Sequence, residues 1–234
     1  MKNEPVKIFW TGGLDSTYRV LQLALAENKE VQPYYLVDFT RRSFPIELDT
    51  IKSLSKEINK RKRNVLPLIV FISDEIPNDE NVYKSFEATK KHTRFGSQYR
   101  YLANFCSFMN INQIEVGMQI HSVNYNDNDF FITDKDKKLI LNENSSSYPV
   151  MKFFKYPIIN LSKHDMLKQA DNYGFLDLLE MTWFCHKPVG KKPCGICPAC
   201  KDAIHQNREL KFARLKFLRK VKRYLAAKIK ALSK

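Results

Sequence analysis

The stretch KIFWTGGLDSTYRVLQLALAEN, residues 7–28, decides the fold of this chain. It begins as an apolar run, passes through Gly12 and Gly13, and continues as an amphipathic segment. Only seven of the 234 residues are glycine, so two adjacent glycines at this point need a reason. Glycine adopts backbone angles, and permits close approaches, that other residues resist. A strand, a Gly-Gly turn and a helix in this order predict a loop that binds phosphate at the helix N-terminus.

A plain tight turn is the alternative interpretation of this loop, with Asp15 or Ser16 serving only as a helix N-cap. Two common nucleotide-binding motifs are absent. The glycines are not followed by the lysine of G-x-x-x-x-G-K-[ST], and the third glycine of G-x-G-x-x-G is missing. Taken without its context, the loop leaves both interpretations open.

The rest of the chain alternates between strand-like and helix-like segments, which predicts a parallel sheet with helices on both faces. Ser162 and Asp165 have the spacing of a capping box at the start of one such helix. Pro67 interrupts one of the strand-like runs near its start. The expected strands are 6–10, 31–39, 64–73, 113–120 and 153–159, and the expected helices are 15–28, 46–62, 97–110 and 161–174.

Composition indicates a soluble globular protein, with 44% hydrophobic and 27% charged residues. No apolar run approaches the ~18 residues of a membrane span, and the N-terminus does not look like a signal peptide. We therefore expect a cytoplasmic protein. In that compartment five cysteines indicate metal binding or reactivity more than disulfides.

Four of the five cysteines lie within CHKPVGKKPCGICPAC, residues 185–200. Two C-x-x-C steps and a cysteine nine residues upstream supply four soft ligands, a set typical of structural zinc. An iron–sulfur cluster is the alternative, because C-x-x-C-x-x-C also suits cluster binding. His186 is interpreted as a bystander and Cys106 as a core residue. The expected metal ligands are Cys185, Cys194, Cys197 and Cys200.

Both signals together resemble one known family. TGGLDST resembles the S-G-G-x-D-S pyrophosphate loop of the ATP pyrophosphatase superfamily, with Thr11 in place of the serine. The 7-cyano-7-deazaguanine synthases of the queuosine pathway combine this loop with four cysteines at the spacing found here. TWFC (182–185), VDFTRR (37–42) and PIINLSK (157–163) are similar to further segments of that family.

The resemblance implies an enzyme that binds ATP on a Rossmann-like sheet and adenylates 7-carboxy-7-deazaguanine. Ammonia then displaces AMP to give an amide, and a second activation dehydrates the amide to a nitrile. Asp15, Ser16 and Lys163 are the implied catalytic residues, with Asp15 helping to place Mg²⁺ and the zinc loop bracing one wall of the pocket. The implied ATP-binding residues are Trp10, Thr11, Gly12, Gly13, Leu14, Asp15, Ser16 and Thr17.

The chain departs from the family where the synthases recognise the deazaguanine. Ser97 and Gln98 stand in place of an R-N element, and the segment 124–131 replaces Y-P-D-C-R. Either the same base is held differently, for example by Asp127 or Asp129, or a related acid is activated. Other amines, including an amine on a protein, are then possible acceptors, and a homodimer is also possible.

A strongly basic tail follows the predicted α/β domain 1–204, which includes the zinc loop 182–201. Residues 205–234 carry eleven lysines and arginines against one acid, and the whole chain has a net charge of +14. The tail's pattern is that of an amphipathic helix, which either packs on the domain or binds RNA, an anionic membrane or an acidic protein. A non-enzymatic, zinc-stabilised nucleic-acid-binding protein is therefore the alternative to an enzyme.

Deleting residues 208–234 is expected to leave a domain that still binds ATP, because the loop, Lys163 and the four cysteines all precede the cut. Salt-sensitive association with polyanions should disappear with the tail, since that association scales with the number of basic contacts. Calorimetry and a salt titration on heparin would measure both effects. Aggregation of the truncated protein would instead show that the tail packs against the domain.

Overall fold

The N-terminal stretch folds as its sequence predicts. The computed structural model describes residues 4–93, 95–119, 130–136 and 138–205. Strand β1 (Val6–Phe9) leads through the two glycines into helix α1 (Leu14–Leu21), which continues as the π-helical turn η1 (Gln22–Ala26). The loop thus lies between the carboxyl end of a strand and the first turn of a helix.

Five strands form one parallel sheet in the order β3-β2-β1-β4-β7. Because β1 is the central strand, the loop that follows it lies in the middle of the sheet's carboxyl edge, where open α/β sheets bind ligands. The other strands are β2 (Val31–Val37), β3 (Ile69–Ile72), β4 (Ile114–Glu115) and β7 (Phe154–Lys155).

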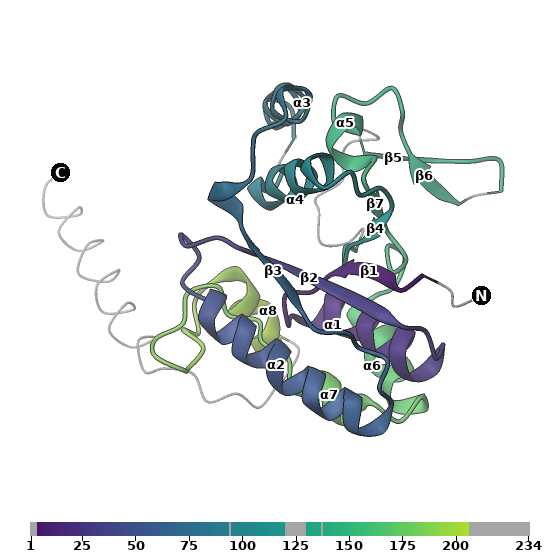
Figure 1. The fold of residues 1–234 in the computed structure, drawn as a ribbon, viewed down its shortest axis with the longest axis vertical. Helices are drawn as coiled ribbons and strands as arrows, with labels where there is room; N and C mark the ends of the chain where they lie inside the picture. Colours follow the sequence, from purple (N-terminus) through teal and green to yellow (C-terminus); the bar gives the residue numbers. More distant parts are fainter. Residues whose placement is uncertain (1–3, 94, 120–129, 137, 206–234) are drawn as a thin grey trace, which may run out of the picture.

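Helices cover both faces of this sheet (Figure 1). Neighbouring residues of a strand point to opposite faces, so Ile8 belongs to one hydrophobic core and Phe9 to the other. With α1, one core contains α2 (Phe44–Arg61), α6 (Lys163–Asn172) and α7 (Leu176–Glu180); the other contains α3 (Glu80–Lys90), α4 (Ser97–Phe108) and α5 (Tyr148–Met151). The predicted α/β sheet with flanking helices is confirmed.

Three predicted strands are much shorter in the structure, and one of them is the run 153–159, which contributes only the two residues of β7. The run 64–73 pairs fully with β2 only from Ile69, because Pro67 has no N–H to donate and Val65 makes only an isolated bridge. The run 113–120 contributes only the two residues of β4. The capping box of Ser162 and Asp165 is present at the start of α6 as predicted.

Several elements were not expected from the sequence. These are helix α3, which Asp79 caps through the amides of Asn81 and Val82, and a small antiparallel hairpin. The short helices α5, α7 and α8 (Pro198–His205) and the 3-10 turn η2 (Ser73–Glu75) also went unpredicted. The hairpin strands are β5 (Phe131–Thr133) and β6 (Leu139–Leu141).

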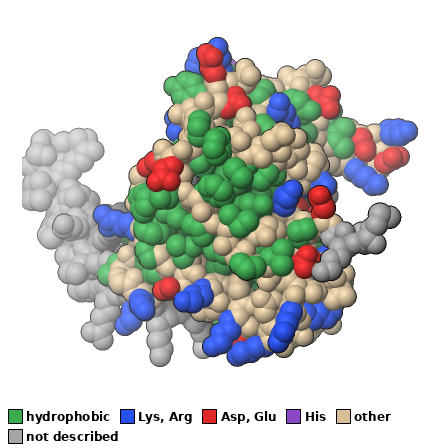
Figure 2. Space-filling view, viewed as in Figure 1, with side chains coloured by type: hydrophobic (Ala, Val, Ile, Leu, Met, Phe, Trp, Pro, Cys, Tyr) green, Lys and Arg blue, Asp and Glu red, His purple; other side chains and the backbone are tan. Residues whose placement is uncertain are grey.

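Strand β3 is the last strand on one side of the sheet formed by the described residues. Ile69 and Val70 of this strand are exposed, and Figure 2 shows hydrophobic side chains gathered in the middle of the surface seen in that view.

Within the described ranges, no helix is long and apolar enough to cross a membrane. The basic tail from residue 206 onward lies outside the described residues.

Candidate active site

The geometry of the loop explains why it carries two glycines. Gly12 has φ +69°, a left-handed conformation that side chains rarely adopt, and a Cβ there would lie 3.2 Å from the Glu47 carbonyl oxygen. Gly13 is the N-cap residue of α1. Thr11 and Ser16 join the two ends of the loop, because their hydroxyl oxygens lie 3.2 Å apart. The loop is therefore closed on itself, with the first turn of α1 at its base.

A cavity of about 280 Å³ opens beside this loop. Thr11, Gly13, Asp15 and Ser16 form one wall of it. Residues from five other regions of the sequence also line it: Arg41 and Glu47; Gln98 and Tyr99; Gly117; Lys163; and Trp183, Phe184 and His186. Lys163 is distant from the loop along the chain, yet the sheet order brings the two segments to one site.

Asp15 has the most unusual environment in the cavity. Its Oδ1 atom is buried and has no hydrogen-bond partner among the described residues. Burial raises the pKa of Asp15 to about 6, while the positive charge of Lys163 acts in the opposite direction. A buried carboxylate oxygen without a donor, beside a phosphate-type loop, has the chemistry of a divalent-cation ligand.

Two backbone contacts fix the loop from outside. The Trp183 amide donates to the Gly12 carbonyl oxygen over 2.9 Å. On the other side, a Cβ added at Gly117 would lie 2.7 Å from the Ser16 nitrogen, so only glycine allows the chain after β4 to pass this close. Sequence reasoning had no signal for Gly117, because its neighbour is distant in the chain.

A buried ion pair ties β4 to α1 beneath the loop. The Arg19 guanidinium donates from Nε to Glu115 Oε2 over 2.7 Å and from Nη2 to Glu115 Oε1 over 3.0 Å. Both side chains are about nine-tenths buried. Such a two-point bond fixes orientation as well as distance, so it holds Gly117 against the first turn of α1.

The four predicted zinc ligands converge on one point. The sulfur atoms of Cys185, Cys194, Cys197 and Cys200 all lie within 4.8 Å of one another, and all four residues are buried. Amides point at two of the sulfurs: the Cys194 N–H donates to Cys185 Sγ and the Cys197 N–H to Cys194 Sγ, over 3.2 and 3.4 Å. These donors stabilise thiolates.

The spacing of the sulfurs fits a single tetrahedral ion. Cys194 Sγ and Cys200 Sγ lie 3.8 Å apart, and Cys197 Sγ and Cys185 Sγ lie 4.0 Å apart. Sulfurs about 2.3 Å from a central zinc in a regular tetrahedron would be about 3.8 Å apart. In a multinuclear iron–sulfur cluster the thiolates bind different iron atoms and spread more widely than this. The site is therefore consistent with zinc.

A comparison with protein-family models gives a match to the family described as "Queuosine biosynthesis protein QueC" over residues 6–208. The match includes the loop, Lys163 and all four cysteines. The chain belongs to the QueC family. Its enzymes convert 7-carboxy-7-deazaguanine to 7-cyano-7-deazaguanine with ATP and ammonia. A search of curated proteins found no match for this chain.

Membership of the QueC family decides between the two functions that the sequence left open, in favour of the ATP-dependent carbon–nitrogen ligase. The structure brings five predicted ATP-binding residues to the cavity: Thr11, Gly13, Leu14, Asp15 and Ser16. Trp10 and Thr17 lie beneath the loop in the core, where the indole N–H donates to the Thr17 hydroxyl over 2.9 Å. Gly12 shapes the loop from within.

The region where this QueC chain departs from the synthase pattern also reaches the cavity. Gln98, at the start of α4, lines it beside Tyr99. Burial raises the pKa of Tyr99 to about 12, which keeps its hydroxyl protonated and able to donate. Asp127 and Asp129, the other residues considered for base recognition, lie outside the described residues.

Cys106 has the surroundings of a core residue, whereas His186 lies at the cavity. His186 is not part of the cluster of four cysteines, and it lines the cavity. Burial lowers its pKa, and the charge of Arg41 adds to that effect. Cys106 lies on the buried face of α4, and burial raises the pKa of its thiol.

Proposed function

We propose that the loop from Trp10 to Thr17 binds the triphosphate of ATP in this cavity, with Lys163 and a cation on Asp15 balancing its charge. The observation that carries the proposal is the meeting of three features at one site: a closed loop at a helix N-terminus, a buried carboxylate oxygen with no donor among the described residues, and a lysine from α6. Negative phosphate groups complement all three.

The reaction of the family assigns a task to each part. An oxygen of the substrate carboxylate attacks the α-phosphorus of ATP, and the bond to pyrophosphate breaks. Ammonia then adds to the acyl carbon and AMP leaves with the carboxylate oxygen. Negative charge grows on the phosphates during the first step, so Lys163 and the amides at the start of α1 stabilise its transition state. When bound, Mg²⁺ would withdraw charge from the phosphate oxygens at Asp15.

We propose that Cys185, Cys194, Cys197 and Cys200 bind one structural zinc ion. All four ligand positions are filled by protein, which leaves no open position for substrate or water. The segment before the first cysteine reaches the cavity through Trp183 and Phe184. The zinc loop thus braces one wall of the site and takes no direct part in the chemistry.

The activity is tested by incubating the protein with ATP, Mg²⁺, ammonia and a set of deazapurine acids. Release of pyrophosphate and AMP together with a nitrile product, identified by mass spectrometry, would establish the substrate. An amide as the final product would show that the second activation is lost. Pyrophosphate release with none of the deazapurine acids would contradict the proposed substrate class.

Replacing Lys163 with methionine is expected to lower kcat/KM about 100-fold, because a charge aimed at the developing negative charge is lost. Lys168→Met is the matched control, since Lys168 is an exposed lysine of the same helix and is not part of the cavity lining. Steady-state pyrophosphate release measures both variants. If the Lys163→Met and Lys168→Met variants are equally active, Lys163 is not part of the proposed site.

A further inference from the structure

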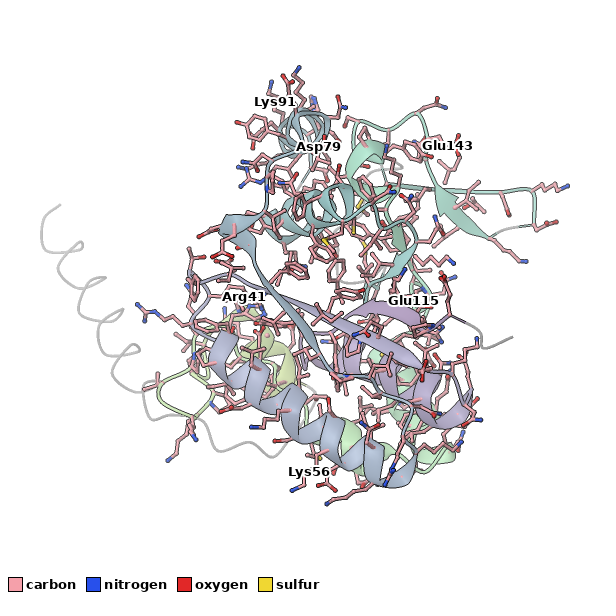
Figure 3. All side chains as sticks on the ribbon, in the orientation of Figure 1. Arg41, Lys56, Asp79, Lys91, Glu115 and Glu143 are labelled. Carbon is pink, nitrogen blue, oxygen red and sulfur yellow. The ribbon has the colours of Figure 1, made fainter. Side chains whose placement is uncertain are left out.

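We propose that Arg41 is a further substrate-binding residue, whose guanidinium binds an anionic oxygen group of a substrate in the cavity, and that Glu47 positions it. The inference rests on the proposed function, since it takes the cavity to be the substrate site. The segment that contains Arg41 follows β2, on the opposite side of the phosphate loop from Lys163. Figure 3 labels Arg41 beside the first turn of α2.

Arg41 lies where two cavities meet. It lines the main cavity and also an adjoining one of about 60 Å³. The residues common to both linings are Phe9, Thr11, Arg41, Gln98 and Leu102. One third of the Arg41 side chain is exposed to solvent in the absence of substrate. A ligand that extends from one cavity into the other must therefore pass the guanidinium.

Glu47 is held so that it can fix the direction of this guanidinium. Its side chain is only 5% exposed. Glu47 Oε1 accepts from Arg41 Nη2 over 2.8 Å and from the Ser43 hydroxyl over 2.6 Å, while Oε2 accepts from the Tyr35 hydroxyl over 2.7 Å. With both oxygens engaged, the carboxylate cannot turn without losing a bond.

The guanidinium keeps hydrogen-bonding capacity for a ligand. Arginine carries five N–H donors in a planar fork, and among the described residues the side-chain bond of Arg41 is the one from Nη2 to Glu47. Carboxylates and phosphates match this fork in a way that a lysine cannot reproduce. Both substrates of the reaction, the acid and ATP, carry such groups.

The same anchor connects Arg41 to the phosphate loop. The carbonyl oxygen of Glu47 faces Gly12, where an added Cβ would lie 3.2 Å from it. The first turn of α2 therefore lies against the loop and also carries the carboxylate that binds Arg41. A pair with only a structural task would need no place in the cavity lining, whereas both Arg41 and Glu47 line it.

Arg41→Met and Arg41→Lys test the proposal in two separate measurements. Calorimetric titration with ATP and Mg²⁺, without the acid, gives the Kd of ATP; initial rates at varied concentrations of the deazaguanine acid give the Michaelis constant for that acid. We expect Arg41→Met to raise either the Kd of ATP or the Michaelis constant for the acid at least 30-fold, and we expect Arg41→Lys to recover part of the lost affinity. A higher Kd identifies a phosphate of ATP as the bound group, and a higher Michaelis constant identifies the carboxylate.

Arg61→Met is the matched control, because Arg61 forms an ion pair with Asp177 away from the cavity. It should change neither constant. If folded Arg41→Met protein keeps both constants within twofold of the parent, the proposal is wrong. Since ATP binding is measured without turnover, that outcome differs from a failure of the proposed function, in which the parent itself does not use the acid.

Glu47→Gln separates a positioning role from a structural one. The neutral amide keeps the size of the side chain but weakens the bond that orients Arg41, so the constant affected in Arg41→Met should rise about five- to tenfold. Tyr35→Phe removes only one donor to Glu47, and it serves as the milder variant if Glu47→Gln does not fold. A lower melting temperature with unchanged constants in both variants would show a purely structural pair.

Discussion

Replacing Asp15 with asparagine is expected to abolish ATP turnover while making the ligand-free protein more stable at neutral pH. The loss of activity should reach at least about 100-fold in kcat, because a charge that would hold Mg²⁺ against the phosphates is removed. The fold should survive, since the side chain keeps its size and Oδ1 makes no hydrogen bond to any described residue. Pyrophosphate release and circular dichroism measure the two outcomes.

The gain in stability follows from the direction of the pKa shift. Burial raises the pKa of Asp15 from 3.8 to about 6, so the folded protein binds this proton more tightly than the unfolded chain does. The contribution of Asp15 is therefore most favourable below pH 4, declines as the pH rises between about 4 and 6, and stays unfavourable above pH 6. Asparagine has no such dependence.

Urea unfolding of both proteins at several pH values would show this difference. Between pH 4 and pH 8 the unfolding free energy of the variant, relative to the parent, should rise by about 2 to 3 kcal/mol. Asp49→Asn on the exposed face of α2 is the control and should show neither effect. If the unfolding free energies of the parent and Asp15→Asn proteins depend on pH in the same way, then folding does not raise the pKa of Asp15.

Replacing one of the four cysteines proposed to bind zinc is expected to have the largest effect on stability. Cys197→Ser should cost at least about 3 kcal/mol, because metal binding in a four-cysteine loop is part of the folding free energy. Cys106→Ala is the matched control: it removes a small buried side chain from the core and should cost about 1 kcal/mol. Chelators should lower the stability of the parent and of the control, but they should change the stability of the Cys197→Ser protein little.

Metal analysis of the purified protein belongs to the same experiment. We expect a colourless protein with about one zinc per chain. A brown protein that contains iron and sulfide would show that the four cysteines bind an iron–sulfur cluster and not zinc, contrary to the sulfur spacing in this structure. Because the Trp183 amide donates to the Gly12 carbonyl, loss of the metal should also weaken ATP binding in protein that remains folded.

Hydrophobic periodicity predicted the fold class correctly but failed where polar residues form the buried face of an element. Helix α3 buries Val82 and Phe86 together with Ser85 and Thr89, so its apolar pattern is too sparse to recognise. Asp79, which caps it, was the available signal. Strand β4 was expected to continue past Glu115, but the close approach of Gly117 to α1 ends it. The residues next to Gly117 in the sequence do not indicate that this close contact forms.

The sequence by itself determined the features that depend on near neighbours along the chain. The Gly12-Gly13 turn, the capping box of α6 and the cluster of four cysteines are local, because residues close together in the sequence form each of them. Only the tertiary structure decided what meets at the cavity. Lys163, Arg41 and Gln98 follow different strands or open different helices, and the strand order β3-β2-β1-β4-β7 brings them to one edge of the sheet. That order arises from the packing of two hydrophobic cores on opposite faces, a cooperative property of the whole chain that no local segment contains.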